Sequence, residues 1–178
     1  QGGFVFGSAG VVPQINWMNV GTTTATGLTL SDNTGSATTA ALTYSGNLLP
    51  IIQVASNVFG DDERLNNSYL ASFSSPLTFT ITGVPYAKYD LITYVSTIFT
   101  GRTYSTKVGA TTLFGLSPNP IGAGYIDNAA TPYTYTSAIG TTAGTATTDG
   151  NYFRFNGLTA STLTFDMDST NDVAGITA

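Results

Sequence analysis

Histidine and cysteine are both absent from this chain of 178 residues. Without histidine the chain cannot build a Ser-His-Asp or Cys-His catalytic centre, nor an ordinary zinc or copper site. Without cysteine it has no disulfide and no thiolate metal ligand, and its redox compartment stays undetermined. An enzyme made from this chain would need a pair of carboxylates, so we expect a protein that is not an enzyme.

Charge is scarce as well, because charged residues make up 8% of the chain against about 25% in typical soluble domains. Five basic residues and a net charge of -5 cannot form a phosphate-binding track, which excludes nucleic acid as a partner. No apolar run approaches the ~20 residues of a transmembrane helix. A surface covered instead by Thr, Ser, Asn and Gly is typical of secreted proteins, so we expect an extracellular or cell-surface location.

Alternation of apolar residues with threonine predicts β-strands. Residues 77–82 and 89–95 form two such runs, separated by Gly-Val-Pro at residues 83–85, and together they predict a central hairpin. In the second run the odd-numbered and even-numbered positions are both apolar enough to be covered, as in a central strand. We therefore predict an all-β fold, a single-domain antiparallel β-sandwich of jelly-roll type over residues 1–178. A domain of this size buries roughly 70% of its unfolded surface.

Turn residues predict further hairpins. Asp-Asn-Thr-Gly at residues 32–35 separates two strand-like runs, and Gly-Ala at residues 109–110 separates two more. Asn156-Gly157 is the strongest short hairpin signal in the chain, and it is followed by alternating apolar residues at 163, 165 and 167. These turns are expected to set the strand register.

Four aromatic residues are candidates for stacking on sugar rings. Trp17, the single tryptophan, is interpreted either as a core plug between the two sheets or as a sugar-stacking platform. Tyr125, Tyr133 and Tyr135 lie near one another in the sequence among threonines. They either bind sugar rings or act as strand aromatics that pack for structural reasons.

Carboxylates gather in two places. The first group is Asp61, Asp62 and Glu63. The second group is Asp166, Asp168 and Asp172. Each is a candidate calcium site, because calcium prefers oxygen ligands, although neither has the spacing of an EF-hand. The alternatives are a short solvated helical turn for the first group and a solvated turn for the second, and the first group is also the starting point for a carboxylate-only glycosidase.

Several motifs together resemble a domain family. They are GVVPQINWMNV (residues 10–20), DDERLNNSYL (61–70), ITGVPYAKYDLITYV (81–95), NYFRFNGLTASTLTF (151–165) and VAGIT (173–177). This set is similar to a jelly-roll, galactose-binding-like β-sandwich domain of secreted and surface proteins of Planctomycetes and Verrucomicrobia. The resemblance implies no catalytic residues, and it implies edge strands that are shortened here or completed by a partner.

Two functional hypotheses follow. The first is a non-enzymatic structural or adhesive extracellular protein, a subunit of a filament or surface layer that self-associates or binds other surface proteins by strand addition at open sheet edges. The second is a carbohydrate-binding module that holds glycans with its aromatic residues.

Overall fold

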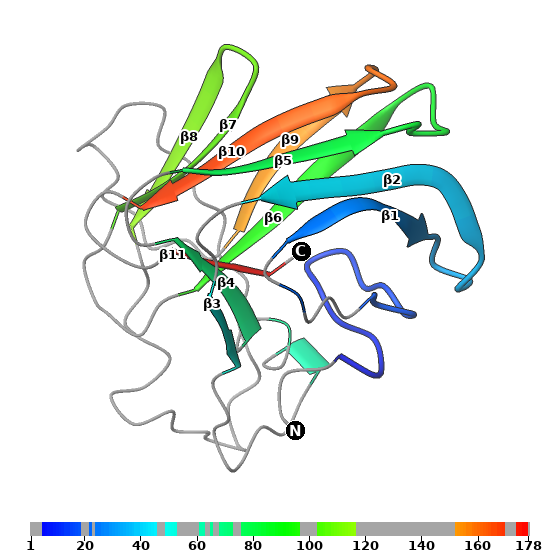
Figure 1. The fold of residues 1–178 in the computed structure, drawn as a ribbon, viewed down its shortest axis with the longest axis horizontal. Coiled ribbons are helices and arrows are strands. Elements are labelled where there is room, and N and C mark those ends of the chain that lie inside the picture. Colours follow the sequence, from blue (N-terminus) through cyan, green and yellow to red (C-terminus); the bar gives the residue numbers. More distant parts are fainter. Residues whose placement is uncertain are drawn as a thin grey trace.

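Two antiparallel sheets contain all the strands of the part of the chain that the structure, a computed structural model, describes (Figure 1). The described residues are 5–18, 22, 24–45, 49–52, 61–62, 65, 68–72, 76–96, 103–116, 152–169 and 174–177. Their strands are β1 (Ala25–Ser31), β2 (Ala37–Ser45), β3 (Leu49–Ile52), β4 (Ser68–Ser72), β5 (Leu77–Thr82), β6 (Tyr89–Ser96), β7 (Thr103–Val108), β8 (Thr111–Leu116), β9 (Tyr152–Leu158), β10 (Leu163–Ser169) and β11 (Ala174–Thr177). One sheet has the order β1-β2-β5-β10-β7-β8 and the other the order β3-β4-β11-β6-β9. This confirms the predicted all-β sandwich.

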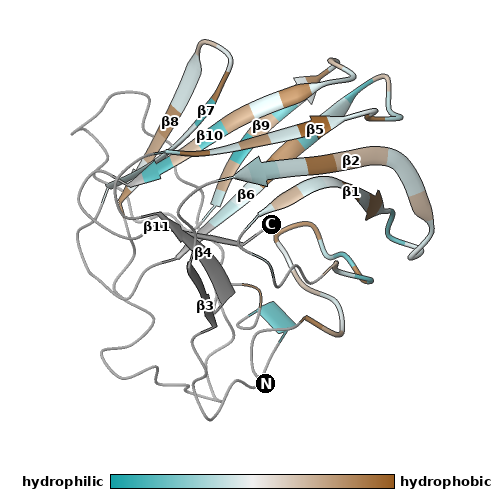
Figure 2. Cartoon of the chain, viewed as in Figure 1, coloured by the Kyte–Doolittle hydropathy of each residue, from teal (hydrophilic) through white to brown (hydrophobic). Residues whose placement is uncertain are grey.

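Alternating side chains from both sheets fill the space between the layers. In β10, Leu163, Phe165 and Met167 are buried, and Figure 2 shows hydrophobic and hydrophilic residues alternating along this strand. Phe165 lies opposite Phe79 of β5, and the two rings stack with centroids 5.0 Å apart. The buried members of this core cluster are Leu42, Tyr44, Leu77, Phe79, Tyr104, Phe153, Phe155, Leu163, Phe165 and Met167. The period-two pattern thus identifies the core face of the strands correctly.

Two of the predicted hairpins are confirmed. β1 pairs with β2 across residues 32–35, and β7 pairs with β8 across residues 109–110. In the first turn Asp32 Oδ1 accepts hydrogen bonds from the Thr34 amide (2.8 Å), the Thr34 hydroxyl (2.6 Å) and the Ser36 amide (3.0 Å). These bonds, of which the one from the Thr34 hydroxyl acts most strongly, lower the pKa of Asp32. The Asp side chain therefore determines the local turn, as turn chemistry predicts.

The hairpin predicted between residues 77–82 and 89–95 is wrong, because β5 and β6 belong to different sheets. Residues 83–88 cross from one layer to the other. Gly83 adopts φ +66°, its carbonyl accepts the Thr39 hydroxyl (2.8 Å), and the Val84 amide donates to the Ser161 carbonyl (3.0 Å). A break between two alternating runs looks the same in sequence whether the second run pairs with the first or crosses the sandwich.

The Asn-Gly pair also has a different role from the one predicted. Asn156 and Gly157 lie inside β9, and they oppose Asp90 of β6 in a β-bulge, since Tyr89 pairs with Leu158 and Leu91 with Phe155. Gly157 has φ +70°, the left-handed conformation that such a bulge requires. β9 and β10 do not pair, so Asn-Gly re-aims the strand rather than reversing it.

A second, smaller cluster covers the outer face of the five-stranded sheet. Its buried members are Val5, Ala9, Leu65 and Tyr94, and its half-buried members are Val11, Trp17, Ile92 and Tyr152. Ile92 and Tyr94 therefore face this cluster, while Thr93 is buried on the opposite face of β6. The prediction that both faces of this strand are covered is confirmed.

The predicted helical turn near the charged group is present where the structure describes it. Asp61, Asp62 and Leu65 have helical backbone, and Leu65 is 1% exposed within the second cluster. Across the described residues, no helix has the length and apolar character needed to span a membrane.

Candidate functional site

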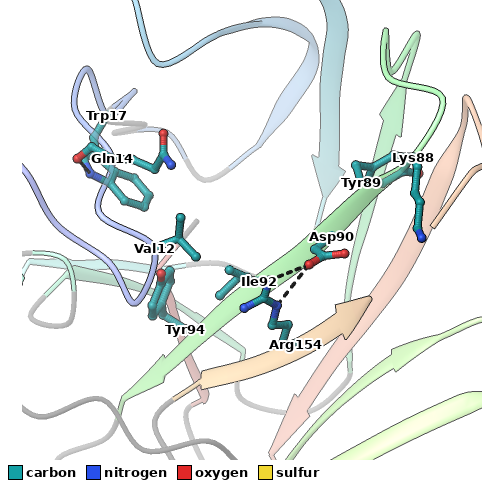
Figure 3. Close-up of a pocket in the computed structure, with 9 residues that line it drawn as sticks. All are labelled: Val12, Gln14, Trp17, Lys88, Tyr89, Asp90, Ile92, Tyr94 and Arg154. Carbon is teal, nitrogen blue, oxygen red and sulfur yellow. Dashed lines mark hydrogen bonds and ion pairs between the residues drawn. The ribbon is translucent and has the colours of Figure 1, made fainter. Parts of the chain in front are cut away.

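An open groove of about 570 Å³ lies between the N-terminal segment and the outer face of β6 and β9 (Figure 3). The described residues that line it are Val12, Gln14, Trp17, Lys88, Tyr89, Asp90, Ile92, Tyr94 and Arg154. In the close-up, Trp17, Gln14 and Val12 lie on one side, and the charged residues Asp90, Arg154 and Lys88 lie on the other, with Ile92 and Tyr89 beside them. A concave surface with a few convergent polar groups is the usual form of a ligand site.

The floor of the groove comes from strand alternation. Successive residues of a strand point to opposite faces, so the burial of Thr93 in the sandwich core places Asp90, Ile92 and Tyr94 on the outer face of β6. Arg154 lies opposite Ile92 on the neighbouring strand β9. The floor is therefore built on two paired strands, which hold their side chains more rigidly than a loop does.

The wall of the groove is a tight turn of the N-terminal segment. Ala9 and Gln14 exchange two backbone hydrogen bonds of 3.0 and 2.9 Å, and the Trp17 Nε1 donates to the Gln14 carbonyl (2.9 Å). Gly10 has φ +97°, and a Cβ at this position would lie 2.7 Å from the Tyr94 hydroxyl oxygen. Glycine is required here because the turn sits directly against β6.

Side chains of the sandwich clamp this wall in place. Asp62 Oδ1 accepts the Gly10 amide (2.8 Å), the Tyr94 hydroxyl oxygen accepts the Val11 amide (3.0 Å), and Asp61 Oδ1 accepts the Phe6 amide (3.0 Å). Hydrogen bonds to charged acceptors are among the stronger ones in proteins. The wall is thus preorganised by interactions with residues far away in the sequence.

Asn16, next to Trp17, holds the end of the wall. It is the one non-glycine residue with positive φ (+60°) in the described part of the chain, and its Nδ2 donates to the Asn33 carbonyl (2.8 Å). Asn tolerates this conformation better than most residues, yet such conformations gather where a site must hold its shape. The indole of Trp17 is half-buried and meets the ring of Tyr94 edge to face, so its position is fixed from both sides.

An ion pair organises the charged end. Asp90 Oδ2 accepts from Arg154 Nη2 (2.6 Å) and Nε (3.1 Å), while Asp90 Oδ1 accepts the Gly157 amide (2.8 Å). The hydrogen bond from Arg154, then that from Gly157, and the positive charges of Arg154 and Lys88 lower the pKa of Asp90. Asp90 is therefore ionised at neutral pH, and the guanidinium of Arg154 is held in one orientation.

Among its described residues, the groove combines an aromatic side chain with one carboxylate that already has partners. Of the described residues that line the groove, Asp90 is the one carboxylate, and glycoside hydrolysis ordinarily uses two carboxylates on either side of the scissile bond. Asp90 is also engaged by Arg154 and Gly157. The groove can instead offer an aromatic surface, apolar contacts and fixed hydrogen-bond donors to a ligand.

Of the four aromatic residues predicted to bind sugar, the structure describes only Trp17. Trp17 lines the groove, and its interpretation as a plug between the two sheets is wrong, because it packs on the outer face of the five-stranded sheet with the second cluster. The cause is the N-terminal segment, which adds a layer that strand alternation does not reveal. Tyr125, Tyr133 and Tyr135 lie outside the described residues.

The predicted calcium ligands lie in different layers. Asp61 and Asp62 bind backbone amides of the N-terminal segment. Asp166 is on the outer face of the six-stranded sheet and accepts the Thr78 hydroxyl (2.7 Å), and Asp168 follows two positions later on the same strand. Glu63 and Asp172 lie outside the described residues. Within the described ranges, no three His, Cys, Asp or Glu side chains come together as a metal site.

The sequence analysis does not identify several of the residues that line the groove: Gln14, Lys88, Asp90, Ile92, Tyr94 and Arg154. A signal for some of them is present. Lys88 and Asp90 alternate at the start of a predicted strand, in a chain where only 8% of residues are charged, so charges at positions 88 and 90 face one side together. Arg154 has no such signal, because its pairing with Asp90 follows from the register of β6 and β9.

Comparison with known proteins assigns no family to this fold and groove. The family resemblance of the five sequence motifs therefore stays a prediction. No protein-family model, no curated protein and no solved structure matches the chain.

Proposed function

We propose that the protein is a non-enzymatic carbohydrate-binding module of the extracellular space or cell surface, and that the sugar lies in the groove beside Trp17. The observation that carries this proposal is the joint presence of a half-buried indole and a fixed Asp90–Arg154 pair in one open groove. The module would act in adhesion, by attaching its carrier to glycans.

Sugar chemistry matches the two ends of the groove. A pyranose ring has C–H faces that are apolar and a rim of hydroxyl groups. Trp17 and Ile92, which are half-buried, supply an apolar and aromatic surface next to the buried ring of Tyr94. Amphipathic aromatic rings suit ligands that are apolar on one side and polar on the other. Asp90 and Arg154 supply an acceptor and donors for neighbouring hydroxyls.

Preorganisation supports the proposal further. The clamp on the N-terminal segment fixes the wall, and the ion pair fixes the charged end, before any ligand arrives. A rigid site loses less conformational entropy on binding than a mobile one. Weakly held neutral ligands such as sugars benefit most from this saving, because each of their hydrogen bonds replaces one to water.

The test uses Trp17 as its own reporter. Since the chain has a single tryptophan, its emission reports on the groove without interference. A soluble glycan that binds should change this emission saturably, and Trp17→Ala should weaken retention on the same immobilised glycan by at least about tenfold, or 1.4 kcal/mol. Tyr86→Ala is the matched control, because Tyr86 is 55% exposed and is not among the described residues of the groove.

If a broad panel of soluble and insoluble glycans leaves Trp17 emission unchanged, the carbohydrate proposal is wrong. The placement of the sugar in the groove is wrong if Trp17→Ala and Tyr86→Ala bind a retained glycan as tightly as the wild type does, because the glycan would then lie elsewhere.

A second candidate function, a structural subunit of a filament or surface layer, is favoured by the sheet edges. Within the described strands, β8 pairs with β7 alone and β9 pairs with β6 alone. An edge strand presents unpaired backbone groups that can accept a strand from another copy or another surface protein. Negative-stain electron microscopy tests this candidate: regular fibres or sheets would support it, and dispersed single particles at high concentration would count against it.

A further inference from the structure

The charged end of the groove holds a large share of the chain's positive charge. The chain has five basic residues in all, and two of them, Lys88 and Arg154, line this groove. With Asp90 as the one carboxylate among the described lining residues, the groove carries a net charge of +1 (two cations minus one anion) in a protein of net charge -5.

We propose that the bound sugar carries an anionic group, a carboxylate or a sulfate, that Arg154 binds this group, and that the charge of Lys88 on the other side of Asp90 attracts it (Figure 3). This inference rests on the proposed function and specifies its ligand class. A cationic patch on a protein of negative net charge attracts anions to that patch. Neutral sugars need no such patch, since Trp17 can contact a neutral ring and Asp90 can accept hydrogen bonds from its hydroxyls.

Arg154 has donors to spare for a ligand. Its guanidinium carries five N–H donors in a planar fork, and Asp90 engages the Nε and Nη2 atoms. The side chain of Arg154 is 43% exposed. Its Nη1 can therefore donate to a ligand while Asp90 holds the guanidinium in place. Asp90 thus orients Arg154 without saturating it, and the oxygens of a planar carboxylate or of a tetrahedral sulfate can accept the remaining N–H donors.

Lys88 supplies the net positive charge of the groove, because Asp90 offsets only the charge of Arg154. None of the described residues forms an ion pair or hydrogen bond with Lys88 in the structure, although its charge acts on Asp90 from a distance. Lys88 Cε lies 3.3 Å from the position that a Cβ on Gly157 would occupy. The lysine stem therefore passes over the bulge, and the same bulge presents the Gly157 amide to Asp90.

The experiment compares matched pairs of acidic and neutral glycans. One pair is an oligogalacturonate and its methyl ester, and the other is a sulfated galactan and its desulfated form, with further neutral glycans printed beside them. We expect the acidic member of at least one pair to bind more tightly than its neutral twin. We expect this preference to shrink between about 0.01 M and about 1 M salt, as the Debye length falls from roughly 30 Å to 3 Å.

Two charge-matched variants locate the effect. Lys88→Gln should weaken binding of the acidic glycan at least about threefold at low salt, and should thereby reduce the preference for the acidic glycan over its neutral twin. Lys107→Gln removes the same charge from an exposed position of β7 in the other sheet, so it should change neither. If Lys107→Gln weakens binding as much as Lys88→Gln does, net charge rather than the groove is responsible and the inference is overturned.

The remaining outcomes separate the two proposals. If neutral glycans bind as tightly as acidic ones and depend on Trp17, the acidic-ligand inference fails while the carbohydrate function stands. If no glycan of either class binds, the proposed function fails and the inference fails with it. The preference for the carboxylate pair or for the sulfate pair identifies the anionic group.

Discussion

Trp17 and Tyr94 meet edge to face, with ring centroids 6.3 Å apart and ring planes inclined at 71°. The contact joins a turn near the start of the chain to the middle of β6. The same tyrosine accepts the Val11 amide through its hydroxyl (3.0 Å). Tyr94 therefore fixes both the backbone of the groove wall and the aromatic ring that we place against the sugar.

Tyr94→Phe should loosen this wall. The Val11 amide loses its acceptor, so the free energy of unfolding should fall by about 1 kcal/mol. Trp17 emission should shift, because its surroundings become more mobile. Chemical denaturation followed by fluorescence measures both effects, and a variant with wild-type stability and emission would show that the clamp is unimportant.

The same substitution should change stability at alkaline pH. Burial raises the pKa of Tyr94 above its ordinary value of 10.0, with smaller effects of the same sign from Asp62 and Tyr152. The folded state then holds the proton more tightly than the unfolded chain does, so this stabilising contribution is complete below pH 10.0 and is lost as pH rises through the folded pKa. Wild-type stability should fall above pH 10.0 more steeply than that of Tyr94→Phe. Burial also raises the pKa of Tyr89, but Tyr89 is present in both proteins.

Thr93 and Thr106 provide a hydrogen bond between the two sheets. Thr93 of β6 is 4% exposed and Thr106 of β7 is 0% exposed, and their hydroxyl oxygens are 3.1 Å apart. Thr93→Val should cost about 1–3 kcal/mol of stability, because it leaves the Thr106 hydroxyl buried without this partner. The double variant with Thr106→Val should cost less than the sum of the two single variants. Additive costs in a double-mutant cycle would contradict the pairing.

Gly83 and Gly27 offer a matched pair for the sheet-crossing corner. Both have positive φ, +66° and +62°, so alanine should cost each about 1–2 kcal/mol through its backbone conformation. A Cβ on Gly83 would also lie 2.4 Å from the Thr39 carbonyl oxygen, whereas one on Gly27 would have nothing within 4 Å. Gly83→Ala should therefore cost a further ~1–3 kcal/mol from overpacking. Equal unfolding midpoints for the two variants would show that the corner is not packed against β2.

Asp62 tests the calcium hypothesis against the clamp. Its Oδ1 accepts the Gly10 amide at 2.8 Å, so Asp62→Ala should lower stability by about 1–2 kcal/mol. The thermal midpoint of the wild type should be the same with millimolar calcium as with chelator, because amides engage both Asp61 and Asp62. A calcium-dependent rise in the wild type that Asp62→Ala abolishes would establish a metal site instead.

Strand alternation predicts much of this fold. The buried faces of β5 and β10 and the two covered faces of β6 follow directly from period-two patterns, and the Asp32 turn follows from local side-chain chemistry. Which strands pair is a different matter. Residues 83–88 and Asn156-Gly157 show that a break or a turn signal does not distinguish a hairpin from a crossing or a bulge, since hydrogen bonds to distant strands decide the outcome.

The groove is less predictable than the fold. Trp17 is identifiable as a candidate because it is the single tryptophan, and Lys88 and Asp90 stand out in a chain with few charges. Arg154 and Gln14 reach the groove only through the β6–β9 register and through the N-terminal turn. Contacts of this kind join segments far apart in the sequence, and no local pattern encodes them.

Calorimetric titration of the wild type, Trp17→Ala and Tyr86→Ala with the glycan that an array retains most strongly tests the central claim most directly. We predict saturable binding to the wild type and to Tyr86→Ala, and at least about tenfold weaker binding to Trp17→Ala. Equal affinity for all three proteins, or an array on which no glycan is retained, would contradict a carbohydrate site in the groove.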